Sequence, residues 1–108
     1  MLRTSEIRSI QANAREVADV LRALSNEARL QMLCHLGTGE LSVGELNARV
    51  ELSQSALSQH LARLRCEGLV ATRREAQTIY YRIADRRVMD LVAALHDIYC
   101  KPSRGRKS

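Results

Sequence analysis

Residues 53–68 read SQSALSQHLARLRCEG, and the spacing of the leucines in this stretch predicts one amphipathic helix. Because successive residues of an α-helix turn by about 100°, Leu57, Leu61 and Leu64 fall in one narrow sector that we expect to be buried. The opposite face carries hydroxyls, amides and an alanine but no acid, whereas an ordinary solvated face is usually rich in lysine and glutamate. Amides pair with adenine edges and hydroxyls adapt to either base partner, so this face fits a DNA major groove. We therefore expect this helix to read DNA.

A shorter helix is predicted directly before the reading helix, separated from it by a tight turn. Residues 42–50 begin with the Ser-x-x-Glu pattern of a capping box, in which both side chains satisfy free backbone donors. Further upstream, apolar residues at steps of three and four predict one long helix over residues 7–24. Another helix is expected to run from Ser25 or Asn26 to Gly37, a residue type suited to the left-handed position behind a helix end.

The pattern changes after Gly68. Residues 69–74 and 78–83 are rich in β-branched and aromatic residues, and they predict a small hairpin. Asp85 then offers an N-cap for a last helix, whose apolar stripe stops before Pro102.

The order of these elements is that of a winged helix-turn-helix. We expect a mainly α fold with a small β-hairpin, an α+β arrangement of five helices and one wing. With 108 residues and 45% hydrophobic composition, the chain can form one modest core, and a domain this small often completes its burial by dimerising. We expect one DNA-binding and dimerisation domain over residues 1–100 and a basic, disordered tail over 101–108.

Positive charge is concentrated at the end of the chain. The net charge is +5, and the last eight residues carry four lysines or arginines and no acid. Such a tail is expected to help hold a polyanion. No apolar run reaches the roughly 18 residues of a membrane span, and the first ten residues lack the apolar stretch of a signal peptide. These features predict a cytoplasmic protein without a membrane partner.

Eight polar side chains are expected to contact double-stranded DNA. Those on the reading helix would contact base edges, and those near the hairpin tip would contact phosphates or the minor groove. For the hairpin group, a charged tip that only aids solubility is the alternative. The eight residues are Gln54, Ser55, Ser58, Gln59, Arg63, Arg73, Arg74 and Gln77.

Three cysteines are present without a CxxC pair, which argues against a disulfide framework and against a zinc knuckle. On its own, Cys34 is expected in the core, because it shares a helix face with Leu30 and Leu33. Cys100 ends the last apolar helix and is expected to be accessible. Cys66 is expected to face outward at the far end of the reading helix, as an incidental surface thiol.

Three strings of the sequence resemble the ArsR/SmtB family of bacterial winged-helix repressors, and the likeness covers about residues 15–100. The resemblance implies a homodimer that pairs through its first and last helices and binds an inverted-repeat operator, with half-sites about one DNA turn apart. It also implies a transcriptional regulator rather than an enzyme, associated with the bacterial nucleoid when bound to DNA. The strings are LRALSNEARLQMLCHL, ELSVGELNARVELSQSALSQHLARLRCEGLV and RREAQTIYYRI.

Family members commonly sense metals, but the two familiar metal sites are not supported here. In arsenic- and cadmium-type sensors cysteines stand where this chain has Ser42 and Gly44, neither of which can bind a soft metal. In the zinc type the last helix begins with Asp-x-His, whereas here Asp85 is followed by Arg86 and Arg87. The comparison with the family therefore predicts no metal and no cofactor.

The pair of Cys34, in the string QMLC, and Cys100, in the string YC, is similar to the BigR, SqrR and HlyU branch of the family. In that branch two such cysteines respond to reactive or sulfane sulfur, including persulfides, by forming a di- or polysulfide bridge that lowers DNA affinity. The resemblance implies the same role for this pair. Cys66 has no counterpart in it.

Two other functions stay open at the level of the sequence. A zinc-responsive repressor would use a non-standard site of Cys34, His96 and Cys100, because His96 and Cys100 are four apart on one helix. A non-sensing anti-repressor would bind the same DNA in every sulfur state. No set of acid, base and nucleophile points to an enzyme.

Overall fold

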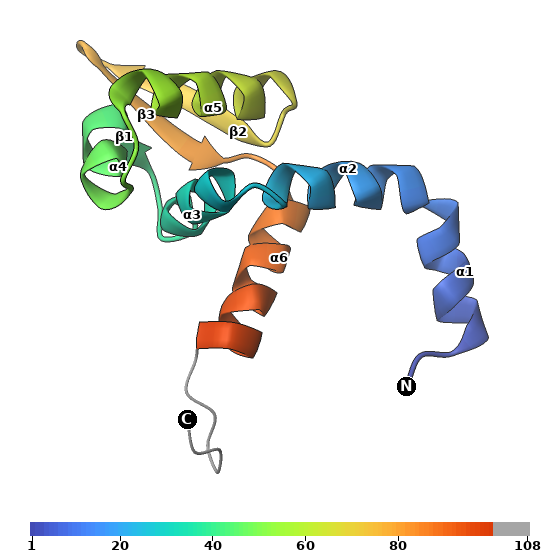
Figure 1. Ribbon diagram of the computed structural model, residues 1–108. Helices are drawn as coiled ribbons and strands as arrows, with labels where there is room; N and C mark the ends of the chain where they lie inside the picture. Colours follow the sequence, from blue (N-terminus) through green and yellow to red (C-terminus); the bar gives the residue numbers. More distant parts are fainter. Residues whose placement is uncertain (101–108) are drawn as a thin grey trace.

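The computed structural model describes residues 1–100 except the side chain of Cys100, and the predicted tail over 101–108 lies outside the described residues. The molecule consists of a head and a projecting arm (Figure 1). The arm contains α1 (Thr4–Ala12) and α2 (Ala14–Leu24). The head contains α3 (Glu27–Leu36), β1 (Leu41–Ser42), α4 (Val43–Arg49), α5 (Gln54–Cys66), β2 (Val70–Glu75), β3 (Thr78–Ile83), α6 (Arg86–Leu95) and the π-helical turn η1 (His96–Cys100).

The helix-turn-helix is formed by α4 and α5, and both helices begin at the predicted caps. The Ser42 hydroxyl accepts a hydrogen bond from the Glu45 amide at 3.1 Å, and the Glu45 carboxylate accepts one from the Ser42 amide at 2.8 Å. At the start of α5 the Ser53 hydroxyl accepts a hydrogen bond from the Ala56 amide at 3.1 Å. These contacts satisfy backbone donors that the first turn leaves free, so local sequence fixes where both helices start.

The predicted helix over residues 7–24 is divided at Asn13 into α1 and α2. Asn13 has φ −111° and ψ 20°, outside helical values, and its side-chain amide donates a hydrogen bond to the Ser9 carbonyl at 2.9 Å. Asparagine forms helix interiors poorly because its side chain competes for backbone groups. The apolar stripe continues across the break, which is why periodicity alone predicted one helix.

The turn behind α3 also differs from the prediction. Gly37 keeps a right-handed φ of −64°, so its predicted left-handed conformation is wrong. The left-handed region is reached two residues later, at Gly39, with φ 138°. The Gly39 amide donates to the Leu36 carbonyl at 3.1 Å, so the chain adds a further tight turn before it leaves the helix.

The wing, defined as β2, β3 and the turn between them, belongs to a three-stranded antiparallel sheet of order β1-β3-β2. Its third strand was not predicted, because two residues show no alternation that a pattern could reveal. β1 places Leu41 opposite Tyr81 and Ser42 opposite Tyr80. This short strand attaches the wing to the segment that leaves α3.

The core lies in the head. Leu57, Leu61 and Leu64 of α5 are fully buried, as predicted, together with Met32, Leu33 and Leu36 of α3 and Val88 of α6, and Val92 of α6 is nearly so. All buried side chains among the described residues are apolar. The head therefore holds together mainly by burial of aliphatic surface.

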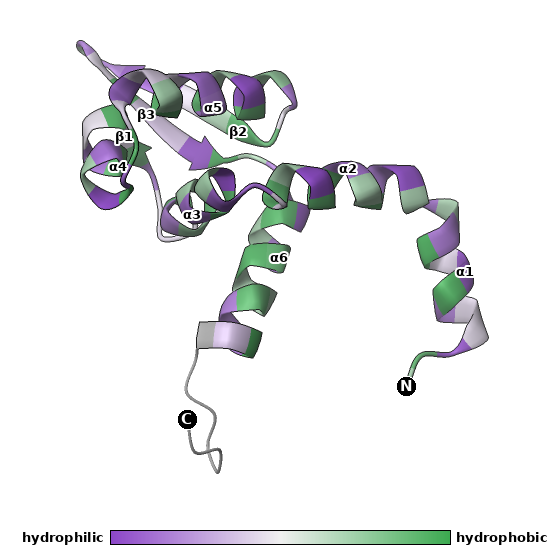
Figure 2. Cartoon of the chain, in the orientation of Figure 1, coloured by the Kyte–Doolittle hydropathy of each residue, from purple (hydrophilic) through white to green (hydrophobic). Residues whose placement is uncertain are grey.

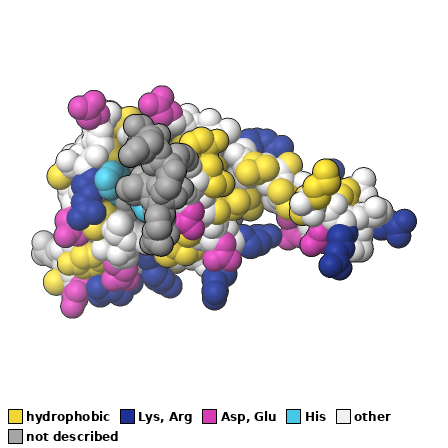
Figure 3. Space-filling view, turned by 90° about the horizontal axis from the view of Figure 1, so that it is seen from below, with side chains coloured by type: hydrophobic (Ala, Val, Ile, Leu, Met, Phe, Trp, Pro, Cys, Tyr) yellow, Lys and Arg dark blue, Asp and Glu magenta, His cyan; other side chains and the backbone are white. Residues whose placement is uncertain are grey.

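The arm exposes an apolar stripe. α1 contains no buried residue, and α2 enters the core only near its end, with Val20, Ala23 and Leu24. Hydrophobic side chains gather along the underside of the arm, between polar ones (Figures 2 and 3). The radius of gyration is 15.9 Å, against about 13 Å for a compact domain of this length. The arm thus lies away from the head and leaves its apolar face uncovered. The apolar stripe consists of Ile7, Ile10, Val17 and Leu21.

No helix within residues 1–100 combines the length and the apolar character that crossing a membrane requires.

Candidate nucleic-acid interface and cysteine groove

The outward face of α5 carries the predicted base-reading residues. Gln54, Ser55, Ser58 and Gln59 are all exposed. By the turn of about 100° per residue, Ser55 and Gln59 lie opposite the buried leucines, whereas Ser58 lies on a flank and Gln54 is the first residue of the helix. The hydroxyls of Ser53 and Ser55 lie 3.4 Å apart at the start of the helix. The first turn of α5 contains no acid, so nothing there repels a phosphate. Cys66 is exposed at the last position of the helix, as predicted.

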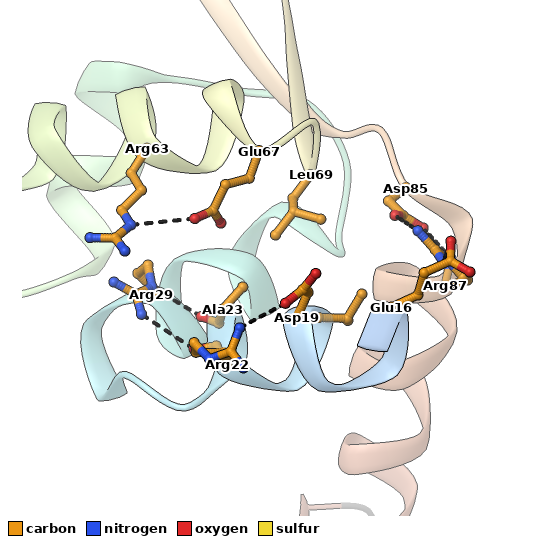
Figure 4. Close-up of a pocket in the computed structure, with 11 residues that line it drawn as sticks. Glu16, Asp19, Arg22, Ala23, Arg29, Arg63, Glu67, Leu69, Asp85 and Arg87 are labelled. Atoms are coloured by element: carbon orange, nitrogen blue, oxygen red, sulfur yellow. Dashed lines mark hydrogen bonds and ion pairs between the residues drawn. The ribbon is translucent and has the colours of Figure 1, made fainter. Parts of the chain in front are cut away.

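Arg63 lies one turn after Gln59, on the flank of α5 that borders a charged cavity of about 460 Å³ between α5, α2, α3 and the start of α6 (Figure 4). Its guanidinium is 3.4 Å from the Glu67 carboxylate one turn further along the helix. On the facing α2, Arg22 pairs with Asp19 at 2.7 Å. Arg29 of α3 donates to the Ala23 carbonyl at 3.0 Å. The cations of this cavity are therefore engaged by neighbouring groups of the protein.

At the far end of this cavity Arg87 joins the arm to α6. It contacts Asp85, the N-cap of α6, at 2.7 Å and Glu16 of α2 at 3.3 Å. The hydrogen bond from the Arg87 side chain lowers the pKa of Asp85, and the same bond raises the pKa of Arg87. Arg87 stands where zinc-type relatives would carry a histidine, and here that position serves an ion-pair network.

Arg73 and Arg74 of the wing, which were both predicted to contact DNA, lie on different faces of the sheet. The Nε–H of Arg73 donates a bifurcated hydrogen bond to the two oxygens of the Glu40 carboxylate, at 2.9 and 3.1 Å, and Nη2 lies 2.9 Å from Oε1. The guanidinium lies over the Tyr80 ring at 4.7 Å from the centroid. Arg74 is exposed and follows Arg73 in the strand, so it lies on the other face of the sheet. Gln77 is exposed in the turn at the tip.

A second cavity of about 550 Å³, the cysteine groove, runs between α3 and the end of α6. Its lining surface is mostly apolar, and His96, Asp97 and Tyr99 line it at the end where η1 begins. Cys34 is part of its wall. The other lining residues are Leu30, Gly37, Thr38, Met89, Val92, Ala93 and Leu95.

Cys34 is exposed, so its predicted place in the core is wrong. The core face of α3 is made by Met32, Leu33 and Leu36, and Cys34 is turned by about 100° from Leu33. The neighbouring Leu30 is only half-buried, which shows where the core face ends. The thiol of Cys34 therefore faces the groove instead of the core.

The second cysteine of the predicted pair follows the groove in the chain. η1 continues directly from α6 to Cys100, and its residues His96, Asp97 and Tyr99 line the groove. The side chain of Cys100 lies outside the described residues, so the pairing with Cys34 stays a prediction. π-Helical turns within or at the end of α-helices are rare and are frequent at functional sites. The sequence carried no sign of this one.

Among the described side chains, no three His, Cys, Asp or Glu residues lie close enough together to hold a metal ion. The zinc site considered from the sequence would also need Cys100, so it stays a prediction.

Fold and site together define a winged-helix DNA-binding regulator. Residues 26–72, from the cap of α3 into β2, match the family described as bacterial regulatory protein, arsR family. The transcriptional activator HlyU of Vibrio cholerae serotype O1 is 49% identical over 98 residues, which cover 91% of each chain. The chain belongs to the arsR family, as the sequence predicted.

Solved structures give the same result. Reduced HlyU from Vibrio cholerae aligns with a TM-score of 0.80 and 51% identity, covering 87% of this chain and 99% of that one. The transcriptional repressor BigR from Xylella fastidiosa aligns with a TM-score of 0.82 and 41% identity, covering 88% and 97%. The predicted winged-helix fold is confirmed, and the named relatives are regulators of transcription, not enzymes.

Proposed function

We propose that this chain is a dimeric repressor that binds an inverted-repeat operator and leaves it when Cys34 and Cys100 are joined by a di- or polysulfide bridge. The observation that carries the DNA-binding part is the acid-free, exposed face of α5, with its amides and hydroxyls opposite a fully buried leucine row. The exposed Cys34 at the apolar groove supports the sensing part.

The apolar stripe of the arm supports a homodimer. Ile7, Ile10, Val17 and Leu21 would be covered if the arm packed against a second copy, with exposed Met89 of α6 on the same interface. Burial of such a stripe is the main source of association free energy. Two copies related by a two-fold axis would present their α5 helices to grooves about 34 to 36 Å apart, which explains why the operator should be an inverted repeat.

The chemistry requires a sulfane-sulfur donor, here a persulfide RSSH. The Cys34 thiolate attacks the terminal sulfur, the donor S–S bond breaks, and RS⁻ leaves to take up a proton, so that Cys34 becomes a persulfide. The Cys100 thiolate then attacks the sulfur bonded to Cys34, forming the disulfide and expelling hydrosulfide. Persulfides on both cysteines join instead as a trisulfide, again with loss of one hydrosulfide. In each route the thiol pair is oxidised by two electrons and the sulfane sulfur is reduced.

The bridge would act on DNA affinity through the helices it joins. It ties the end of α3, which packs beside α4 in the head, to the end of α6. If the bridged geometry misplaces the two α5 helices relative to successive grooves, affinity for the operator falls. A coupling of about 1 to 3 kcal/mol, or roughly 5-fold to 150-fold in affinity, is usual for allosteric proteins.

The test begins with an operator selected from a random duplex library, and affinity is then measured by fluorescence anisotropy before and after treatment with inorganic polysulfide. The wild type should lose operator affinity, and mass spectrometry should find Cys34 and Cys100 in one cross-linked peptide. The Cys34→Ser and Cys100→Ser variants should keep their affinity. Cys66→Ser is the matched control and should respond like the wild type. A response that survives in either single variant of the pair would refute the switch.

A zinc-responsive repressor is the second candidate, because His96 and Cys34 border the same groove. Titration of the reduced protein with Zn²⁺ distinguishes the two. Stoichiometric binding that alters operator affinity and is lost in His96→Ala would favour zinc over sulfur. An anti-repressor without a sensor would bind the operator equally in the reduced and polysulfide-treated forms.

A further inference from the structure

Arg73 is held on three sides by its own protein. Its guanidinium makes a two-point contact with Glu40, lies 3.3 Å from the Glu75 carboxylate, and covers the face of the Tyr80 ring. Glu40 precedes β1 and is 33 residues away in sequence, so the contact joins the wing to the segment that leaves α3. An arginine that has two carboxylates and an aromatic ring as partners has little left to offer a phosphate.

The strand register places Arg73 and Arg74 on opposite faces of the wing. Residues paired across an antiparallel ladder share a face, and neighbours along a strand alternate. Arg73 is paired with Tyr80, and Arg74 with Ile79. Arg74 therefore shares its face with Val70, which is buried in the core together with the leucines of α5.

The two faces of the wing therefore have different surroundings: the face that carries Arg74 can approach DNA, and the face that carries Arg73 contacts the rest of the protein. The face that carries Arg74 is the one turned toward α5, and the hairpin tip extends beyond that helix (Figure 1). Arg73 lies on the reverse face, where Glu40 binds it. Gln77, in the turn between the strands, is exposed at the tip.

We propose that Arg73 is a positioning residue whose pair with Glu40, the wing latch, fixes the angle of the wing so that Arg74 and Gln77 reach DNA. This inference rests on the proposed DNA binding, and it removes Arg73 from the predicted contacts. The latch acts by geometry: β1 pairs with β3 only at Tyr80 and Tyr81, so the part of the hairpin nearer to the tip depends on this contact for its orientation.

The contact differs from an ordinary surface ion pair. Exposed pairs are usually weak, because two long side chains must be ordered against full solvent screening. Here the side chains of Arg73 and Glu40 are 45% and 30% exposed, the contact is made at two points, and the aromatic ring restricts the guanidinium from one side. The hydrogen bond from Arg73 also lowers the pKa of Glu40, and the reciprocal bond raises the pKa of Arg73. The Glu40 carboxylate therefore keeps its charge at neutral pH.

The operator affinity of the Glu40→Gln variant decides between two roles of Arg73, because an anchor and a phosphate contact predict changes of affinity in opposite directions. If Arg73 is an anchor, this variant weakens operator binding by about threefold to tenfold and leaves the slope of log affinity against log salt unchanged. If Arg73 contacts a phosphate, loss of Glu40 frees the cation, so that binding strengthens and the slope steepens. That second result, or an unchanged affinity, overturns the proposal.

The matched control is Glu75→Gln, which removes the same charge nearer to the tip but only the longer contact with Arg73. It should not weaken binding as Glu40→Gln does. Arg74→Gln should reduce the magnitude of the salt slope by about one, as expected for a lost phosphate contact. Arg73→Gln should weaken binding with the slope retained, and combining it with Glu40→Gln should add no further loss. Additive losses in the double variant would show that the residues do not act as a pair.

Amide hydrogen exchange of the wing, measured without DNA, separates failure of the latch from failure of the proposed function. Exchange of the amides in residues 73–78 should accelerate in Glu40→Gln, while the amides of α5 keep their protection. If the wild type binds no DNA but the wing exchanges faster in the variant, the latch holds the wing and the proposed function is wrong. Unchanged exchange in the wing overturns the latch whatever the DNA result.

Discussion

The apolar helix faces are buried in the head and exposed in the arm, although both regions are built from amphipathic helices. In the head, the leucines of α5 are buried in a core to which α3, α6 and the sheet also contribute. In the arm, Ile7, Ile10 and Leu21 form an equally regular stripe, and this chain covers none of them. An apolar stripe therefore predicts that a face becomes buried, but not whether the same chain or a second copy buries it.

The largest expected effect is in the head. Leu61→Ala should cost about 2 to 5 kcal/mol of unfolding free energy, because it leaves a cavity where the side chain is 1% exposed. Urea denaturation followed by circular dichroism measures this loss, which should not depend on protein concentration. Leu21→Ala is the matched change in the arm, and its cost should grow with protein concentration because the partner is a second chain. If both variants lost the same unfolding free energy at every protein concentration, the apolar stripe of the arm would not be buried by a second copy.

A charge placed in the arm should separate association from folding. Ile10→Asp puts a carboxylate into the stripe, so the protein should sediment as a monomer and lose operator affinity while the helical signal of the head persists. Ser5→Asp adds the same charge on the opposite side of α1 and should remain a dimer. Sedimentation velocity compares the two. A wild type that sediments as a monomer at high concentration would contradict the proposed role of the arm.

The smallest expected effect concerns the wing and depends on pH. Because the folded-state pKa of Glu40 is lowered, its bond to Arg73 stabilises the fold above the ordinary carboxyl value of 4.5 and is lost as the pH falls through the folded value. The urea midpoint of the wild type should exceed that of Glu40→Gln at neutral pH, and the two should converge in acid. If the difference between the two urea midpoints grew as the pH fell, the bond between Glu40 and Arg73 would not be its cause.

Much of the head could be predicted because its determinants are local. The hydroxyls of Ser42 and Ser53 begin their helices through contacts within one turn, and three leucines of α5 define its buried side by rotation alone. The same local reasoning predicted the exposed, acid-free face of α5 that we propose reads DNA. It failed at Asn13, where one poor helix former interrupts a stripe that is otherwise periodic.

Other predictions failed or stayed open because they depend on contacts between distant segments. Cys34 was expected in the core, since it shares a helix face with Leu30 and Leu33, but the position of α6 decides that it faces a groove. Arg73 and Arg74 look alike in sequence, and only Glu40, from another part of the chain, distinguishes them. β1 exists only because β3 lies beside it.

The sequence by itself determined the order of the elements, the caps and the side of α5 that can meet DNA, because these follow from contacts between residues a few positions apart. Only the tertiary structure decided which arginine of the wing binds a carboxylate, that the thiol of Cys34 faces the groove, and that the arm leaves its apolar stripe uncovered. Those outcomes depend on which distant surfaces meet, and periodicity along one helix or strand carries no information about its neighbours in space.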